Sequence, residues 1–546
     1  MGDRKLLSWR TVILMAGIFW LVCSFLALHR YFNFFPTFVA FDQGIFNQVF
    51  WNSLHGRWFE SSLSSTESSV VQLDGAIPDV FYRRLGQHFT PSLLLWLPVY
   101  ALLQSPAGLS LLQVTLMTLG GFMLYKLARV YHPPRLAGMF ALSYFCANAV
   151  LAPTVANFHD FSQVPLFVFG LLLAMEKRHW WKFWVLAGLT LLVREDAGVV
   201  LFGVGFYMAV SRRFLQMGIL LCAASLGYML LLTNIVMPLF SDDISRRFMV
   251  EQFGQFVDNK EASTFEVLLA ILRNPIQLLA ELVNPPDRTL RYLLAQWVPL
   301  AFVPVISVDA WLLAGFPTLK ILMQHDPVAL SMHLRYAVTL VPGLFYGTIL
   351  WWAKHPQRFQ PRTARIWLIC IGIGLFFTIT SNPNRSLSFI IPDSVQPWVY
   401  VSPGRQWQHA QAVRSLLRQI PADASVTATN NIINHLSSRR EAQRFPGIEL
   451  RNDAQQVIQV EYAVVDMWYP LQFSPAFDGE GRDVIRMQGQ VKGLLDPKVY
   501  GLVDFQDGVA LLQRGKPSNP AAIANWEAFQ TTTQHLSLEV IVPSVG

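Results

Sequence analysis

Long apolar segments recur through most of this chain, and they constrain its fold more than any other feature. Crossing the hydrocarbon core of a bilayer takes about 20 apolar residues, and fewer when flanking side chains reach the interface. Hydrophobic residues make up 53% of the 546 residues and charged residues only 14%, against about a quarter charged in soluble proteins. The sequence therefore predicts a polytopic α-helical membrane protein.

Eleven segments follow this rule when the shorter central ones are included. They lie near 9–28, 109–129, 136–155, 161–176, 181–195, 197–211, 214–237, 293–307, 309–323, 334–353 and 364–381. With the N-terminus inside, four of the inner connections carry Lys and Arg, as the positive-inside rule expects. A fifth inner connection, near Asp309, is the exception: it is placed inside only because successive spans must alternate in direction. Eleven spans then place the C-terminus outside.

The basic N-terminus also resembles a signal peptide, because MGDRKLLSWR precedes an apolar stretch. That stretch is long and ends in HRYFNFF instead of a small-residue cleavage site, so we interpret it as a retained first span. The formal charge of +7 reflects the basic connections and does not indicate a nucleic-acid partner. The four cysteines all lie in apolar runs, so no disulfide framework is expected.

Two long loops are predicted on the outer side, at about 29–108 and 238–292. Each contains an apolar stretch unsuited to spanning: 91–104 is short and contains Pro98, and 264–284 is broken by Arg273-Asn274-Pro275. We expect both stretches to lie as helices at the outer membrane interface. The Ser-rich segment 61–69 is expected to be a flexible loop. Elaborate outer loops and short inner connections favour a function on the outer face.

The apolar runs end near residue 400, which separates a transmembrane domain (1–400) from a soluble α/β domain (401–515) and a tail (516–546). Helical periodicity at 406–420, 430–440 and 481–495 alternates with apolar strands at 422–429 and 461–468, and a strand pair with a Gln-Asp-Gly turn follows at about 500–514. No Gly-rich phosphate loop of Walker or Rossmann form is present in the sequence, so no nucleotide cofactor is expected.

Asp42, in FDQGIFNQ, is the first acidic residue after the first span. Ionisable groups in or beside membrane spans are costly and are functional candidates by default. The Asp42 carboxylate is suited to accept a proton from an attacking hydroxyl or amine, or to bind a divalent cation. The alternative is structural, because Asp before GIFNQVF suits a helix N-cap.

Two further outer segments carry imidazole groups. His88, in QHFTP, can donate to a phosphate or act as a base, or it can be a capping histidine at the interface. His159 and Asp160, in NFHDFSQVP, lie at the predicted outer end of two spans. Such a pair is a weak signal alone, since it is common by chance.

Two clusters of charge complete the predicted outer face. Arg194, Glu195 and Asp196 are consecutive between two apolar runs, so they must be solvated, paired or coordinating; a simple polar turn is the alternative. Lys320, His333 and Arg335 flank another outer turn, where cations suit a phosphorylated lipid but also suit a solvated loop with extended side chains. All five segments are expected to bring acid, imidazole and cation chemistry to one side of the bilayer.

Several motifs together resemble one family. FDQGIFNQVFWNSLHGR, QHFTPSLLLWLPVYAL, NFHDFSQVP, VREDAG, HLRYAVTLVP and IPADASVTATNNIINHLSSRREAQRFP are similar to the DUF2079 family of prokaryotic integral membrane proteins, from about residue 10 to 515. Residues 61–80 look like an insertion relative to that family, whose function is uncharacterised. The family is similar to the GT-C superfamily of glycosyltransferases, which includes protein mannosyltransferases and lipid A aminoarabinose transferases.

The GT-C resemblance implies a GT-C-like membrane domain in the cell membrane of a prokaryote. It also implies a polyprenyl-phosphate-linked sugar as donor. An Asp shortly after the first span is catalytic or metal-binding in these enzymes, and Asp42 matches that position. The resemblance further implies that a basic residue near the helix after that loop contacts the lipid phosphate, for which His88 is the nearest candidate. It also implies that the His159–Phe161 segment matches the second acidic motif. Gln43 follows Asp42, so the paired acids common in GT-C enzymes are not matched.

The function expected from these features is transfer of a sugar from a polyprenyl-phosphate donor to an unknown acceptor on the extracytoplasmic face. Asp42 would be the catalytic base; His88, His159, Asp160, Arg194, Lys320, His333 and Arg335 would bind substrate. Glu195 and Asp196 would hold a divalent metal, Mg or Mn, if one is used. The alternatives are a non-catalytic transporter of a lipid or polymer, and a membrane scaffold whose outer domain binds partners.

Overall fold

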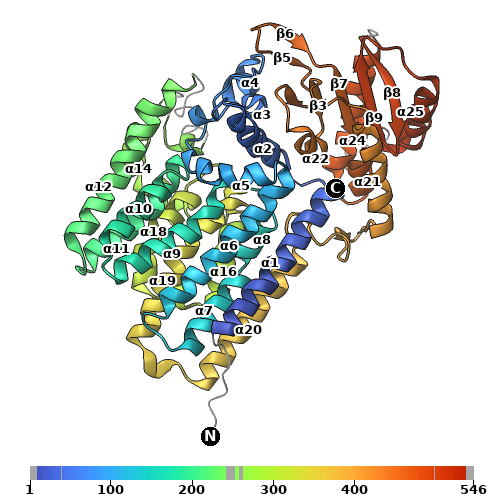
Figure 1. Cartoon of the computed structure of the whole chain (residues 1–546). Helices are drawn as coiled ribbons and strands as arrows, with labels where there is room; N and C mark the ends of the chain where they lie inside the picture. The colour runs from blue at the N-terminus through green and yellow to red at the C-terminus, as the bar shows by residue number, and fades with distance from the viewer. Residues whose placement is uncertain are drawn as a thin grey trace. The chain divides into compact units, whose positions relative to one another are not determined.

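The computed structural model describes residues 9–37, 40–241, 252–257, 262, 264–496 and 499–536 (Figure 1). Parts of the predicted outer loop 238–292 and of the tail 516–546 lie outside the described residues. The chain forms two compact units. Unit 1 comprises Met1–Phe25, Arg84–Leu102 and Gly108–Pro383, and unit 2 comprises Leu26–Arg83, Leu103–Ala107 and Asn384–Gly546.

Five helical segments among the described residues are long and apolar enough to cross a membrane. They are α1 (Trp9–Phe32), α6 (Pro106–Ala128), the segment Leu215–Leu239 that begins with α12 (Leu215–Leu231), the segment Arg335–Lys354 that ends with α19 (Val341–Lys354), and α20 (Pro361–Thr380). A bent pair, α7 (Pro134–Cys146) and α8 (Asn148–Thr154), meets at 47° and gives a sixth if it is one span. The chain thus has the several apolar helices of a polytopic membrane protein.

The predicted count of eleven spans is not confirmed, because the remaining segments form short helices. These are α9 (Val164–Glu176), α10 (Trp180–Leu191), α11 (Gly198–Val210), α16 (Pro286–Trp297), α17 (Val303–Ile306) and α18 (Val308–Leu322). A helix of 13 residues is only about 20 Å long. The predicted span 293–307 is interrupted where Ala301 and Phe302 both adopt positive φ between α16 and α17.

The two predicted interfacial stretches do form helices. Residues 91–102 fold as η2 (Pro91–Trp96) and α5 (Leu97–Leu102). Residues 264–281 fold as α14 (Thr264–Arg273) and α15 (Pro275–Glu281), with the break at Asn274 before Pro275. Proline lacks the N–H that continues a helix, which explains the position of this break.

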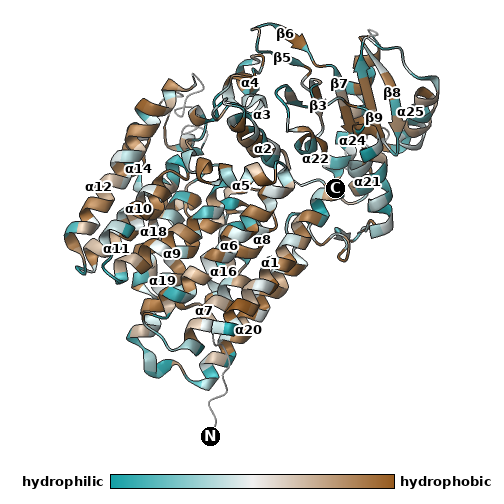
Figure 2. Cartoon of the chain, viewed as in Figure 1, coloured by the Kyte–Doolittle hydropathy of each residue, from teal (hydrophilic) through white to brown (hydrophobic). Residues whose placement is uncertain are grey.

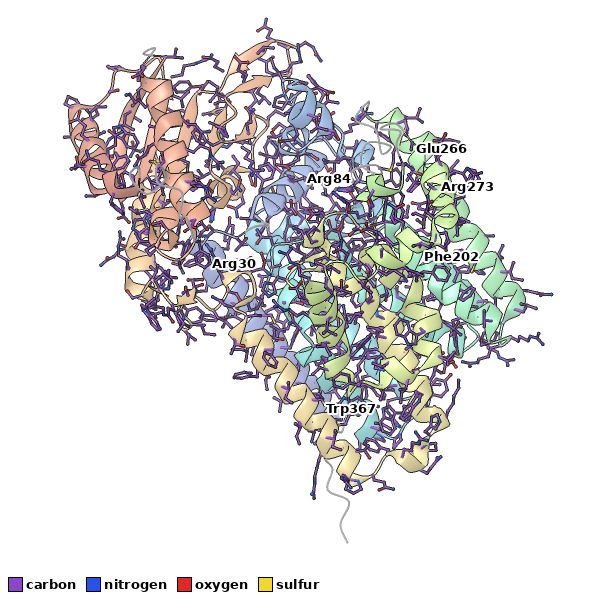
Figure 3. All side chains as sticks on the ribbon, turned by 180° about the vertical axis from the view of Figure 1, so that it is seen from behind. Arg30, Arg84, Phe202, Glu266, Arg273 and Trp367 are labelled. Carbon is purple, nitrogen blue, oxygen red and sulfur yellow. The ribbon has the colours of Figure 1, made fainter. Side chains whose placement is uncertain are left out.

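Some helices of unit 1 have exposed apolar surfaces, which we call lipid-type surfaces, and others are packed in its interior. Only 22% of an apolar 18-residue stretch is buried in Leu215–Leu239 and in Pro361–Thr380, against 89% in Arg335–Lys354. Most residues of α12 and α20 are hydrophobic (Figure 2). Trp367 on α20 is fully buried (Figure 3), and its indole donates to the Pro299 carbonyl at 2.9 Å. A Cβ on Gly347 would lie 2.3 Å from Ala310 Cα, so only glycine permits this close approach of α19 to α18.

Connections predicted on the inner side meet within unit 1. The Arg213 guanidinium donates to both Glu176 oxygens, at 2.9 and 3.0 Å, and Tyr131 Oη donates to Glu176 at 2.5 Å. Lys354 Nζ donates to Asp309 Oδ2 at 2.6 Å. These pairs join the ends of helices that are far apart in sequence, and they bring the connection at Asp309 together with a basic connection.

Unit 2 contains a five-stranded sheet in the order β4–β3–β7–β9–β8. Strands β3 (Val426–Ala428), β4 (Ala442–Arg444) and β7 (Tyr462–Asp466) are parallel, and β8 (Tyr500–Gln506) and β9 (Val509–Arg514) form an antiparallel hairpin. Asp507 and Gly508 both have positive φ in the turn between them, as two-residue hairpin turns require. Every residue of β7 is buried, because helices cover both faces of the sheet.

The helices of unit 2 are α21 (Pro403–Leu417), α22 (Asn430–Ile433), α23 (Trp468–Phe473), α24 (Asp478–Leu495) and α25 (Pro520–Thr532). The first helix after the first span, α2 (Ala40–Leu54), belongs to the same unit. Its Phe41 and Ile45 share one hydrophobic cluster with Val426 and Leu511 of the sheet. Residues 26–83, assigned from sequence to a loop of the transmembrane domain, therefore contribute to the core of unit 2.

The Ser-rich segment is ordered, so the expectation of a flexible loop is wrong. Helix α3 (Ser62–Thr66) is buried throughout. Ser62 Oγ donates to the Ala442 carbonyl at 2.6 Å, and Gln48 Nε2 donates to Ser62 Oγ at 2.9 Å. The Ser-rich composition suggested a flexible loop, but these hydroxyls have buried polar partners, which offset the cost of burying them.

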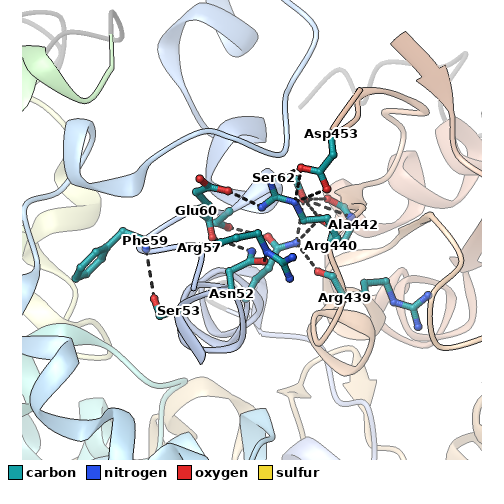
Figure 4. A network of polar contacts seen from close by, with 12 residues as sticks. Asn52, Ser53, Arg57, Phe59, Glu60, Ser62, Arg439, Arg440, Ala442 and Asp453 are labelled. Atoms are coloured by element: carbon teal, nitrogen blue, oxygen red, sulfur yellow. Dashed lines mark hydrogen bonds and ion pairs between the residues drawn. The ribbon is translucent and has the colours of Figure 1, made fainter. Parts of the chain in front are cut away.

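Ion pairs around Arg440 reinforce this part of unit 2 (Figure 4). Its guanidinium lies 2.7 Å from a carboxylate oxygen of Glu60 and 2.7 Å from one of Asp453. Arg444 pairs with Glu67 at 2.6 Å. The segment 60–67 is thus held to the segment 440–453 by charge as well as by hydrogen bonds.

Candidate functional site

Unit 1 contains a buried cluster of charged residues centred on Arg194. Helix α10 ends at Leu191 and α11 begins at Gly198, and the polar sequence between them forms η4 (Glu195–Ala197). Because apolar helices lie on both sides, the charged side chains of Arg194, Glu195 and Asp196 must find partners inside the protein. Its members, which we call the Arg194 cluster, are Arg84, His88, Asp160, Arg194, Glu195, Asp196, Lys320 and Arg335.

Arg194 is 1% exposed. Its Nε lies 3.3 Å from Glu195 Oε1 and 3.5 Å from Asp196 Oδ1. The guanidinium carbon lies 5.3 Å from the centroid of the Phe161 ring, a cation–π distance. Its Nη1 has no hydrogen-bond partner among the described residues. Although burial opposes the charged form, Asp196 and Glu195 raise the pKa of Arg194, so it is a fixed cation.

His88 connects Arg194 to Glu195. Its Nε2 lies 3.3 Å from Arg194 Nη2, and its Nδ1 lies 2.9 Å from Glu195 Oε1. A guanidinium can only donate, so Nε2 accepts and Nδ1 carries the proton. Burial, and then Arg194, lower the pKa of His88 well below its usual range. His88 is therefore neutral, and both of its nitrogens orient protein groups.

Glu195 is held on both oxygens. His88 donates to Oε1, and the Phe89 backbone N–H donates to Oε2 at 2.9 Å. Asp196 forms an ion pair with Lys320 through Oδ2. Each carboxylate of the η4 turn is thus matched to a cation or a hydrogen-bond donor from a different segment of unit 1.

Asp160 lies fully buried beside these groups, at the start of η3 (Asp160–Gln163). Its Oδ1 accepts from the Phe161 N–H at 2.9 Å. Within the part of the chain that the structure describes, Oδ2 has no hydrogen-bond partner. Its charge acts on both His88 and Arg194. The side chain of His159 is buried, and its backbone N–H donates to Gln113 Oε1 at 2.9 Å.

The structure brings most of the predicted binding residues together, but not all. Arg335 acts electrostatically on His88, and its guanidinium lies 5.4 Å from the Tyr336 ring centroid. His333 instead contacts Ser381, with Nε2 3.2 Å from Oγ. The Arg194 cluster contains four cationic side chains, three carboxylates and a neutral imidazole.

Glu195 and Asp196 do not fit the metal site proposed for them. Both carboxylates are already neutralised by Arg194 or Lys320. No group of three or more His, Cys, Asp or Glu that could hold a metal occurs in the described ranges. A hard cation such as Mg²⁺ needs several oxygen ligands, and nearby guanidinium and ammonium groups repel it. No step of the proposed reaction is therefore assigned to a metal.

Asp42 belongs to unit 2. Helix α2 begins at Ala40, so Asp42 is the third residue of the helix and not its N-cap, and the capping alternative is wrong. A carboxylate in the first turn still interacts favourably with the helix dipole. The next residue, Gln43, is buried, and its Nε2 donates to the Pro106 carbonyl at 2.6 Å.

A family model described as "Predicted membrane protein (DUF2079)" matches residues 30–511. The chain belongs to this family. It is therefore a membrane protein, in agreement with the five candidate spans. None of the curated proteins searched matches this DUF2079 sequence.

The solved structures that resemble this DUF2079 protein include two, each with 13% identity to it. One is the crystal structure of ArnT from Cupriavidus metallidurans bound to undecaprenyl phosphate, with 13% identity, a TM-score of 0.48, and 95% of this chain and 100% of that chain covered. The other is the oligosaccharyltransferase of Archaeoglobus fulgidus in complex with Zn and sulfate, with 13% identity, a TM-score of 0.45, and 89% and 71% covered. Scores this low do not establish a shared fold or activity.

Sequence reasoning missed Arg84 as a member of the Arg194 cluster. Arg83 and Arg84 are adjacent in a polar loop, and only the structure shows that Arg84 is buried while Arg83 is exposed. The only signal was its position four residues before His88. Adjacent arginines are ordinary at a membrane surface, so burial could not be inferred from sequence alone.

Proposed function

We propose that this DUF2079 protein is a GT-C-type glycosyltransferase that transfers a sugar from a polyprenyl-phosphate-linked donor to an acceptor on the extracytoplasmic face. The observation that supports this most is the buried Arg194 guanidinium, whose Nη1 lacks a partner among the described residues. A buried donor without an acceptor is costly. A phosphate oxygen of the donor lipid would satisfy it.

The charge of the Arg194 cluster fits a phosphate leaving group. In the transition state, negative charge grows on the phosphate oxygen as its bond to the sugar breaks. Cations already fixed in place stabilise that charge without further reorganisation. Arg194 is fixed by Glu195 and Asp196, and Lys320 is fixed by Asp196. His88, being neutral, positions Glu195 and Arg194 instead of adding charge.

The proposed reaction is a single displacement at the anomeric carbon. The acceptor oxygen or nitrogen forms a bond to that carbon, and the bond from carbon to phosphate oxygen breaks with its electron pair leaving on the phosphate. Asp42 takes the proton of the acceptor. Asp160, with one carboxylate oxygen not hydrogen-bonded among the described residues, accepts a hydrogen bond from a sugar hydroxyl. The lipid carries the activated sugar, so no nucleotide cofactor is needed.

The proposed placement follows from the charge pattern and the reaction. The protein lies in the cell membrane of a prokaryote with its N-terminus cytoplasmic and the C-terminal α/β domain outside. The Arg194 cluster then faces the side on which the lipid-linked sugar is used. A transporter or a scaffold would not require Asp42.

Mass spectrometry of lipids that co-purify with the full-length protein in detergent tests this proposal. We expect a polyprenyl-phosphate sugar on the wild type, and accumulation of it on Asp42→Asn, because the variant binds the donor but cannot deprotonate the acceptor. The matched control is Asp74→Asn, in the same segment of unit 2 and outside the proposed site. Bulk membrane lipids alone on all three proteins would favour a transporter or scaffold.

A further inference from the structure

A pocket of about 370 Å³ lies in unit 2, at the C-terminal end of α1, and no step of the proposed reaction uses it. One side is aromatic, formed by Tyr31, Phe32 and Phe34. The other is cationic, formed by Arg414 of α21 and by Arg418, the C-cap of that helix, and His435 of η13 (Asn434–Leu436) lies between them. The combination of aromatic and guanidinium groups around one opening suggests an anionic ligand with an apolar part.

Arg418 caps the C-terminus of α21 with helical backbone angles, so it lies on the same face as Arg414, four residues earlier. Arg414 Nη2 donates to the Phe32 carbonyl at 2.5 Å, and its guanidinium carbon lies 5.8 Å from the Phe34 ring centroid. Arg418 is exposed. Considering only the residues the structure describes, neither arginine forms an ion pair with a carboxylate. The pocket therefore carries two positive charges that the surrounding side chains do not neutralise.

His435 supplies a further polar atom inside the pocket. Its ring stacks on Tyr31, with centroids 4.0 Å apart and an interplanar angle of 16°, and lies 4.1 Å from the Phe34 ring. Its Nε2 is buried, with no hydrogen-bond partner in the described ranges. Burial lowers the pKa of His435 to about 3, and the ring hydrogen-bonds the Tyr31 backbone. The ring is therefore neutral with its proton on Nδ1, and Nε2 can only accept a hydrogen bond, as from a hydroxyl group of a ligand.

The position of the pocket at the end of a membrane span indicates the source of that ligand. Helix α1 has 24 residues and is about 36 Å long, which exceeds a hydrocarbon core of about 30 Å. Tyr31 and Phe32 are its last aromatic residues, and Phe32 is about half exposed. Aromatic residues gather at the level of the lipid headgroups, and arginine binds phosphate through paired N–H groups.

We infer that this pocket binds an anionic phospholipid headgroup, with its phosphate held by Arg414 and Arg418, a headgroup hydroxyl donating to His435 Nε2, and the aromatic side against the glycerol and upper acyl region. This inference does not depend on the proposed glycosyl transfer, since it concerns different residues in unit 2.

Hydrogen exchange of the full-length protein in neutral detergent tests the inference. The probes are dioctanoyl phosphatidylglycerol, dioctanoyl phosphatidylcholine and inorganic phosphate, and the readout is protection of peptides covering 411–420 and 431–437. We expect phosphatidylglycerol to protect both peptides in the wild type. Its apparent Kd should rise at least tenfold in the double variant Arg414→Gln/Arg418→Gln, because charge-assisted hydrogen bonds are lost.

Arg482→Gln on α24 is the matched control, because Arg482 is an exposed arginine of the same unit, and its Kd should equal that of the wild type. If the double variant does not fold, Arg418→Gln alone decides, since its exposed side chain makes no described contact. Equal protection by inorganic phosphate would retain the phosphate site but overturn the lipid source. Protection that is unchanged in the variants, or equal with phosphatidylcholine, would overturn the inference.

Discussion

Replacing Arg194 with methionine is expected to destabilise unit 1 by about 3–5 kcal/mol, the usual cost of removing one partner from a buried ion pair. The substitution keeps most of the side-chain volume but leaves Glu195 and Asp196 without their shared cation, and it deprives His88 Nε2 of its donor. Titration with a denaturing detergent in mixed micelles measures the loss in the free energy of unfolding.

Arg362→Met is the matched control, because Arg362 is exposed; surface substitutions usually change stability by less than about 0.5 kcal/mol. Arg194→Lys should recover only part of the stability, since an ammonium cannot reproduce the planar fork. If Arg194→Met matched the control, the cluster would be solvated and the ion pairs would contribute little.

Unit 2 is expected to lose stability as the pH rises, because of His409. This residue is fully buried; its Nε2 lies 3.2 Å from Asp466 Oδ2 and its Nδ1 lies 2.9 Å from Asp507 Oδ2. Burial alone would lower the pKa of His409, but Asp466 and Asp507 raise it above the usual value. The protonated ring is therefore favoured in the folded state, and Trp468 stacks on it with centroids 4.1 Å apart.

The sign of the pH effect follows from that shift. A raised pKa means that the stabilisation is complete below about pH 6.5, the value in the unfolded chain. Above it, stability falls by about 1.4 kcal/mol per pH unit until the pH passes the folded-state pKa. Hydrogen exchange of β7, measured from pH 6 to pH 9 and corrected for intrinsic rates, should show this fall in the free energy of opening.

His409→Gln should be less stable than the wild type at pH 6 and should lack this slope, because glutamine does not titrate. His535→Gln is the control, since His535 is exposed and its Nδ1 lies 3.1 Å from the Thr532 carbonyl; it should keep the wild-type slope. A slope of equal size in His409→Gln would assign the pH dependence to another group.

The sequence predicted the long apolar helices because a membrane span requires a continuous run of apolar residues. It also predicted α21, α24 and the β8–β9 hairpin, where periodicity and an Asp-Gly turn agree with the fold. It did not predict that residues 26–83 share a core with the C-terminal sheet. Contacts such as that of Gln48 with the Arg439 carbonyl depend on tertiary pairing between segments almost 400 residues apart, which local patterns do not encode.

The candidate site was predicted in part for a physical reason. Charged residues between apolar helices must meet partners, so the proximity of His88, Arg194, Glu195 and Lys320 follows from the cost of leaving any of them alone. The partners themselves were not predictable. Nothing in the order Arg-Glu-Asp shows that Glu195 pairs with His88 while Asp196 pairs with Lys320, and that arrangement is what argues against a metal.

The most direct test of phosphate-lipid binding at the Arg194 cluster is photo-crosslinking of the full-length protein with a diazirine-bearing polyprenyl phosphate. We predict crosslinked peptides from 84–96, 157–163, 192–198 and 318–336, and a marked loss of them in Lys320→Gln but not in Lys492→Gln, an exposed lysine on α24. Crosslinks confined to the lipid-type surfaces of α12 and α20, and unchanged by Lys320→Gln, would contradict the proposed site.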